Sequence, residues 1–82
     1  MKIVWDEPKR RSNIDKHGFD FSSLSIDFFA PATFVPGKDG RLVALGWLEG
    51  DAVAVVFAPL GTEAVSIISM RSASLKERKA IR

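Results

Sequence analysis

The side chains best suited to acid–base chemistry lie near the two ends of this 82-residue chain. His17, the single histidine, directly follows Lys16, and imidazole ordinarily titrates near neutral pH. Near the other end, Arg71, Glu77 and Arg78 place two cations and a carboxylate close together in sequence. Groups of these kinds can cleave RNA without a metal. A base takes the 2′-hydroxyl proton, an acid protonates the leaving 5′-oxygen, and cations stabilise the charge of the transition state.

The spacing leaves the individual roles of these residues open. His17 or Glu77 could be the base or the acid, and Arg71, Arg78 and Arg82 suit charge stabilisation. His17 also has a structural interpretation, because a histidine at the C-terminal end of a helix is favoured by the helix dipole and can donate a hydrogen bond to a terminal carbonyl.

Positive charge is concentrated at the two ends of the chain. Residues 1–17 and residues 71–82 each contain five lysines and arginines, whereas only Lys38 and Arg41 lie between them. If the two ends meet in the fold, they form a patch suited to phosphates. The alternative is a solvated last helix whose cations favour the negative end of the helix dipole. The candidate phosphate-binding residues are Lys9, Lys79 and Arg82.

Composition narrows the classes of protein further. A chain of this length makes a single domain, residues 1–82. The absence of cysteine excludes a disulfide framework, a thiolate metal site and a cysteine nucleophile. No metal-ligand spacing and no glycine-rich phosphate loop is present, so we expect no metal and no cofactor. No segment approaches the roughly 18 apolar residues of a membrane span, and the first residues have no apolar run of the kind that would lead us to expect a signal peptide. We therefore expect a cytoplasmic protein with no membrane association.

The N-terminal elements should position the basic residues of that end. Residues 2–5 are expected to form a short strand, and Asp6 favours the start of a helix that runs to His17 and ends at a glycine cap. Ile14 is the only large apolar residue of this helix, so the helix should lie on the surface. A second helix is expected over residues 22–29. Its core-facing residues are Phe21, Leu24 and Phe28.

Four extended segments follow, separated by the turn-like sequences PGKDG, LEGD and PLGT. Such short connections join antiparallel strands, so we expect a curved, four-stranded antiparallel meander sheet. The segment 52–58 contains no polar residue and should be a central strand that is covered on both faces. The expected strands are residues 33–35, 41–48, 52–58 and 64–70.

The last strand and the last helix should position the C-terminal cations. Alternation along the strand places Arg71 on the same face as Val65, Ile67 and Ser69. Ser74, with a glutamate three residues later, forms a capping-box sequence that predicts the start of the last helix. The sequence therefore predicts an α+β domain in which two N-terminal helices and one C-terminal helix pack on the meander sheet.

The two ends of the chain together resemble the BrnT family of toxins. The opening VWDEPKRRSNIDKHGFDF is similar to a family segment in which W-D-x-x-K leads through a helix to K-H-G and an aromatic residue. The ending IISMRSASLKERKAIR is similar to the family pattern I-I-S-x-R-x-A-x-x-x-E-R. Gly40, Arg41 and Gly46 match the central hairpin of the family. The residues that match at the two ends are Trp5, Asp6, Lys9, Asn13, Lys16, His17, Gly18, Phe21, Ile67, Ile68, Ser69, Arg71, Ala73, Glu77 and Arg78.

This resemblance implies a RelE-like fold and a ribonuclease toxin of a type II toxin–antitoxin pair that inhibits translation by cutting RNA. It also implies a BrnA-like antitoxin, whose ribbon-helix-helix domain would bind operator DNA. The chain departs from the family at residues 57–60, Ser66 and Ser72, where polar or basic residues are usual. The alternative is therefore a catalytically weakened or inactive member that acts as an antitoxin-binding or RNA-binding module. The candidate catalytic residues are Lys16, His17, Arg71, Glu77 and Arg78.

Overall fold

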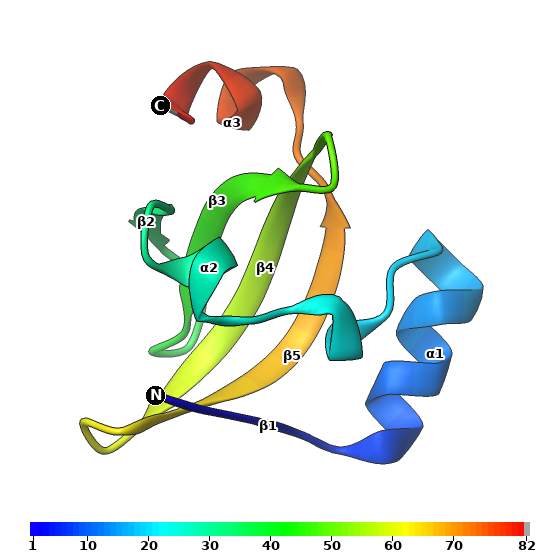
Figure 1. The fold of residues 1–82 in the computed structure, drawn as a ribbon, viewed down its shortest axis with the longest axis vertical. Helices are drawn as coiled ribbons and strands as arrows, with labels where there is room; N and C mark the ends of the chain where they lie inside the picture. The colour runs from blue at the N-terminus through cyan, green and yellow to red at the C-terminus, as the bar shows by residue number, and fades with distance from the viewer. Residues whose placement is uncertain (82) are drawn as a thin grey trace.

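Five strands form a single mixed sheet in the order β1-β5-β4-β3-β2, with the helices arranged around it (Figure 1). The structure is a computed structural model, and it describes residues 1–81. The elements are β1 (Lys2–Trp5), α1 (Glu7–His17), the 3₁₀ helix η1 (Phe21–Ser23), α2 (Ile26–Phe29), β2 (Thr33–Pro36), β3 (Leu42–Leu48), β4 (Asp51–Leu60), β5 (Ala64–Ser72) and α3 (Leu75–Ala80).

The predicted α+β class fits this structure, but the predicted four-stranded antiparallel meander is wrong. Strands β2 to β5 pair antiparallel with their sequence neighbours. β1 then adds a fifth strand, which pairs parallel with β5 from Lys2 opposite Ala64 to Trp5 opposite Ile67. Turn sequences report only on strands that are adjacent along the chain, so they could not reveal a pairing between the first strand and the last.

The prediction of two N-terminal helices is also wrong. α1 is present, and Gly18 caps it in the left-handed conformation with φ 76°. The second predicted helix, however, is divided into η1 and the single turn α2. Ser25 interrupts it, because its hydroxyl oxygen accepts a hydrogen bond from the N–H of Asp27 (3.2 Å) and starts a new turn. The core-facing residues predicted for this region, Phe21, Leu24 and Phe28, are all buried.

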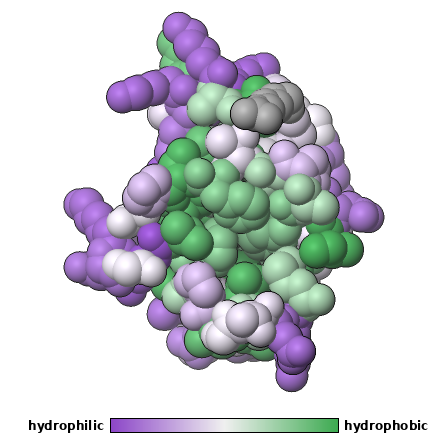
Figure 2. Space-filling view, turned by 90° about the vertical axis from the view of Figure 1, so that its left-hand side faces the viewer, coloured by the Kyte–Doolittle hydropathy of each residue, from purple (hydrophilic) through white to green (hydrophobic). Residues whose placement is uncertain are grey.

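The main core lies between one face of the sheet and the short helices. Phenylalanines of η1 and α2 pack there against β4 and β5. β4 is central in the sheet, as predicted, and Val53, Ala54 and Val55 are completely buried. Seen from the side where β2 lies, apolar residues gather at the centre of the surface and hydrophilic ones surround them (Figure 2). Phe34 of β2 contacts Phe57 of this core yet remains half exposed, so the β2 edge of the core is only partly covered.

The opposite face of the sheet carries a smaller cluster of buried apolar residues, Val43, Leu45 and Ala54. Val35, Val56 and Ile81 pack against them. We call these six residues the second-face cluster.

A β-bulge in β5 decides which side chains reach this second face. Phe57 of β4 pairs with Ile67, but the preceding residue, Val56, pairs with Ser69. Ile68 is therefore an additional residue in β5, and the alternation of side chains restarts after it.

The bulge places Arg71 opposite to the face that simple alternation predicts. Val65 and Ile67 belong to the main core, whereas Arg71 pairs with Ala54 of the second-face cluster. Ser69 precedes Arg71 by two residues and shares its face. The prediction that Arg71 lies on the face of Val65 and Ile67 is thus wrong.

α3 is positioned by its capping box, by its side-chain contacts and by the residue that follows it. The predicted capping box is present: Ser74 Oγ accepts a hydrogen bond from the N–H of Glu77 (3.1 Å), and Glu77 Oε1 accepts one from the N–H of Ser74 (2.8 Å). Further along, the guanidinium of Arg78 lies 5.3 Å from the centre of the Trp47 ring. Ile81, just after the helix, packs on the second-face cluster. No residue within α3 itself is buried.

Candidate functional site

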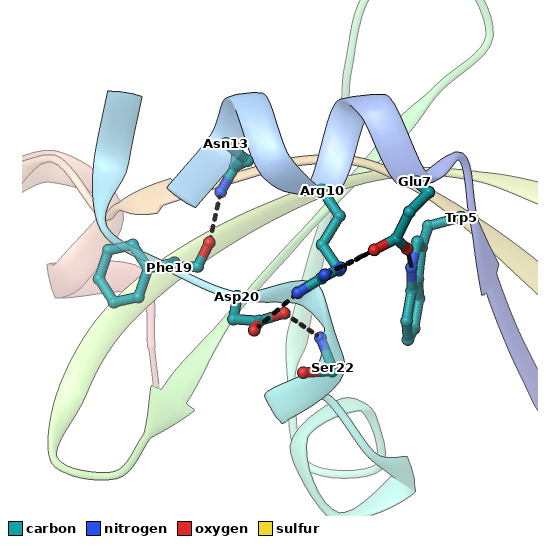
Figure 3. Close-up of polar contacts among 7 residues, drawn as sticks. All are labelled: Trp5, Glu7, Arg10, Asn13, Phe19, Asp20 and Ser22. Carbon is teal, nitrogen blue, oxygen red and sulfur yellow. Dashed lines mark hydrogen bonds and ion pairs between the residues drawn. The ribbon is translucent and has the colours of Figure 1, made fainter. Parts of the chain in front are cut away.

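α1 is attached to β5 by an amide side chain and not by an apolar stripe. Asn13 is the only buried residue of α1. Its Nδ2 donates to the carbonyls of Met70 (2.9 Å) and Phe19 (3.0 Å; Figure 3), and its Oδ1 accepts from the N–H of Met70 (3.0 Å). β1 pairs with β5 only as far as Ile67. The Asn13 amide therefore takes the place of a neighbouring strand at Met70.

A polar network fixes the first half of α1 (Figure 3). Arg10 donates to Glu7 (2.6 Å) and to Asp20 (3.0 Å), and the indole N–H of Trp5 donates to Glu7 (3.0 Å). The hydrogen bond from Arg10, reinforced by that from Trp5, lowers the pKa of Glu7. The N–H of Ser22 is the main cause of the lowered pKa of Asp20, to which Arg10 adds. Both carboxylates thus stay ionised, and α1 is held in one orientation against η1.

An open cavity of about 360 Å³ lies between α1 and β5, and the buried Asn13 is part of its lining. Its lining includes Lys9, Lys16 and His17 from the helix and Ile68 and Ser69 from β5. We call it the helix cavity. The C-terminal end of α1 thus presents a histidine and a lysine side by side toward the bulge of β5.

A second cavity, of about 330 Å³, lies over the second face of the sheet. Its apolar lining comes from Val43, Val56 and Ile68, and its cationic lining from Lys38, Arg41 and Arg71. Gly37 and Ser69 complete it. We call it the sheet cavity.

The two cavities share Ile68 and Ser69 and therefore adjoin across the bulge of β5. Together they form what we call the basic groove. Five lysines and arginines and His17 line it, and its lining residues within 1–81 include no aspartate or glutamate. The lining residues therefore carry an excess of positive charge, although the whole chain has a net charge of only +2.

Arg71, at the rim of the groove, is paired with Glu77 through two hydrogen bonds. Nη1 lies 2.7 Å from Oε1, and Nη2 lies 3.0 Å from Oε2. The bonds from Arg71, and next those from Ser74, lower the pKa of Glu77 to about 2. The same pairing raises the pKa of Arg71. Near neutral pH, Glu77 is therefore a carboxylate, and in this geometry it accepts two hydrogen bonds from Arg71.

Comparison with known proteins identifies the group to which this fold belongs. The sequence profile of the ribonuclease toxin BrnT, of type II toxin–antitoxin systems, matches residues 5–77. The chain belongs to the BrnT family. The crystal structure of the Brucella abortus ribonuclease toxin BrnT is 56% identical to the chain, with a TM-score of 0.84. That match covers 90% of this chain and 97% of the Brucella chain. No curated protein sequence matches the chain.

The BrnT-family fold brings some of the predicted site residues together and separates others. Lys9, Lys16 and His17 line the helix cavity, and Arg71 lines the adjoining sheet cavity. Arg78 instead lies over Trp47. Glu77 stands behind Arg71, Lys79 is exposed on α3, and Arg82 lies outside the described residues.

Three residues of this BrnT-family site were not recognised as site residues from the sequence. Asn13 belongs to the BrnT-like motif at the N-terminal end, but the motif alone gives it no contact. The available signal is that a helix so poor in apolar residues needs a polar side chain to attach it to the sheet. Lys38 and Arg41 are isolated charges in the sequence, between its two basic ends. The match of Arg41 to the family's hairpin was the sole indication of a role.

Residues 1–81 of this BrnT-family chain contain neither a cluster of metal ligands nor a membrane-spanning helix. No three His, Asp or Glu side chains of residues 1–81 gather closely enough to share a metal ion. Within the same residues, no helix is long and apolar enough to cross a membrane.

Proposed function

We propose that this chain is an endoribonuclease toxin that inhibits translation by cutting RNA, without a divalent metal, in the cytoplasm. The observation that supports this proposal is the basic groove, whose described lining carries five cationic side chains, a histidine and no carboxylate. A groove of this charge attracts the phosphodiester backbone. Membership of the BrnT family of ribonuclease toxins supports RNA as the ligand.

In the proposed reaction, the scissile phosphate lies near Ser69, where the helix cavity and the sheet cavity adjoin. His17 takes the proton of the 2′-hydroxyl, and the 2′-oxygen attacks phosphorus. The bond to the 5′-oxygen then breaks, and the imidazolium of His17 returns the proton to that oxygen. The products are a 2′,3′-cyclic phosphate and a free 5′-hydroxyl.

Cationic groups of the groove stabilise the charge that develops on the phosphoryl oxygens. We assign this role to Lys16 and Arg71, which come from the two sides of the groove. Glu77 acts as a positioning residue, because a carboxylate with a pKa of about 2 cannot serve as the acid. We assign Lys9, Arg78 and Lys79 to phosphates on either side of the scissile bond.

The test is cleavage of a mixed-sequence RNA by the purified protein in the presence of a chelator. His17→Ala should lower kcat at least about 100-fold, which is the lower limit for the loss of a general base. Lys76→Ala is the matched control, because Lys76 is an exposed cation that lines neither cavity. Full activity of His17→Ala, or cleavage that requires a divalent metal, would contradict the proposal.

We also propose that the neutralising partner is a BrnA-like antitoxin with a ribbon-helix-helix domain, through which the complex binds operator DNA. Family membership implies an antitoxin of some kind, and the charge of the groove suits a partner with acidic groups. Such a partner should associate faster at low than at high ionic strength. An association rate that is indifferent to salt would place the antitoxin away from the groove.

The second candidate function is binding of RNA or antitoxin without cleavage. The pairing of Arg71 with Glu77 favours it, since this arginine already has an anionic partner. RNA affinity that falls with salt, with no strand cleavage under any condition, would select this function over the first.

A further inference from the structure

We propose that the sheet cavity binds an unstacked nucleobase of the RNA substrate. This inference rests on the proposed function, because it assigns one part of the basic groove to a base of the same RNA. Positive charge does not by itself account for the sheet cavity, where Val43, Val56 and Ile68 form an apolar surface beside Lys38, Arg41 and Arg71.

The apolar surface of the sheet cavity is part of the fold itself. Val43 is buried and Val56 packs against it in the second-face cluster. Ile68 joins them because it is the additional residue of the bulge and is half-buried between the two cavities. Three aliphatic side chains on adjacent strands line one side of the cavity and suit contact with the face of a heterocycle, whereas a phosphate gains nothing from contact with them.

The cations around this patch are held on ordered backbone. Lys38 and Arg41 lie in the turn between β2 and β3, which is closed by hydrogen bonds from the N–H of Gly37 to the carbonyl of Arg41 (2.9 Å) and from the N–H of Arg41 to the carbonyl of Lys38 (3.1 Å). Neither side chain forms an ion pair with any residue in 1–81. Both remain free to contact the phosphates that flank a bound base.

The two adjoining cavities offer separate places for a base and for the backbone of the RNA. The helix cavity presents Lys9, Lys16 and His17 of α1, and the sheet cavity presents the three aliphatic side chains together with cations of the β2–β3 turn. Because both cavities are lined by Ile68 and Ser69, a single nucleotide could place its base on the sheet and its phosphate at the junction of the cavities. A base stacked in a duplex cannot reach this surface, so the substrate class is single-stranded or loop RNA.

The first experiment uses the unmodified protein and NMR spectra of its methyl groups. The probes are a short single-stranded DNA oligomer, which lacks the 2′-hydroxyl and cannot be cut by this reaction, and an abasic oligomer of the same length. The DNA oligomer should shift the methyl signals of Val43, Val56 and Ile68, and the abasic oligomer should not. Equal shifts with both probes, or none with either, overturn the inference.

The second experiment fills the cavity. Val56→Phe should lower the affinity for the base-bearing oligomer at least about fivefold, the lower end of what one base contact contributes, and should leave the abasic oligomer unaffected. Ile26→Phe is the matched control, because Ile26 is exposed on α2 and lines neither cavity. If Val56→Phe does not fold, the spectra of the unmodified protein still decide the question.

Failure of this inference can be told apart from failure of the proposed function. Cleavage by the unmodified protein, with no difference between base-bearing and abasic probes, leaves the ribonuclease proposal standing and removes the nucleobase site. Selective binding of the base-bearing probe without cleavage removes the ribonuclease proposal and leaves the nucleobase site standing. Methyl shifts produced by the antitoxin, but by no oligomer, would overturn the inference and assign the patch to the protein partner.

Discussion

Replacing Asn13 by alanine should detach α1 from the sheet. Asn13 is the one buried residue of this helix, and its amide makes all three hydrogen bonds that join the helix to Met70 and Phe19. In the variant, the N–H and the carbonyl of Met70 lose their partner where no strand lies beside β5. α1 has no apolar side chain in the main core that could hold it there.

The expected loss of stability follows from these three bonds. A typical hydrogen bond contributes about 0.5–1.5 kcal/mol net, and a buried group left without a partner costs about 1–3 kcal/mol unless water reaches it. Because α1 can move away and admit water, we expect a loss of about 3 kcal/mol. A domain of this size has about 4–12 kcal/mol in total. The melting temperature should therefore fall by roughly 12–24 °C.

Thermal unfolding and amide hydrogen exchange measure this effect together. The control is Asp15→Ala, an exposed position of the same helix, which should change stability by less than about 0.5 kcal/mol. In Asn13→Ala, the amides of α1 should exchange rapidly while those of β4 remain protected, because the helix opens locally before the sheet does. A melting temperature no lower than that of Asp15→Ala would refute the view that this amide holds the helix.

Three further predictions concern other parts of the fold. Ser74→Ala should destabilise the protein by about 1 kcal/mol through loss of the capping box, and an unchanged denaturation midpoint would contradict this. Glu77→Gln should cost about 1 kcal/mol at pH 7. This difference from the unmodified protein should fade as pH falls from 4.5, the usual pKa, to about 2, because the folded-state pKa is lowered; unfolding curves at several pH values test it. Gly46→Ala should cost about 1–3 kcal/mol, because a Cβ there would lie 2.9 Å from the buried ring of Phe28, and unaltered stability would show that the ring moves freely.

The elements that follow local rules could be predicted from the sequence. The first helix, its glycine cap and the capping box at Ser74 depend on residues a few positions apart, and the structure contains all three. The prediction of one continuous second helix was wrong because the Ser25 hydroxyl accepts a hydrogen bond from the N–H of Asp27 and starts a new turn there. The predicted four-stranded sheet was wrong because β1 pairs with β5, a strand almost a full chain length away.

The candidate site was predictable only in part, for a related reason. His17 and Lys16 were visible because they adjoin a glycine cap. The face of Arg71 was not, because a bulge leaves no clear mark in the sequence and reverses every assignment after it. Lys38 and Arg41 enter the groove through strand pairing, which no local pattern reports.

The parallel pairing of β1 with β5 bears on how the protein is made in the cell. The basic groove includes residues of α1, near the start of the chain, and of β5, near its end. The groove is therefore complete only when both elements have folded. Synthesis proceeds at roughly 5–20 residues per second, and a nascent chain therefore spends several seconds with α1 complete and nothing to dock it against. Contacts this distant in sequence also form slowly after release. The basic groove therefore forms only after most of the chain has been synthesised, because its two walls come from opposite ends of the sequence.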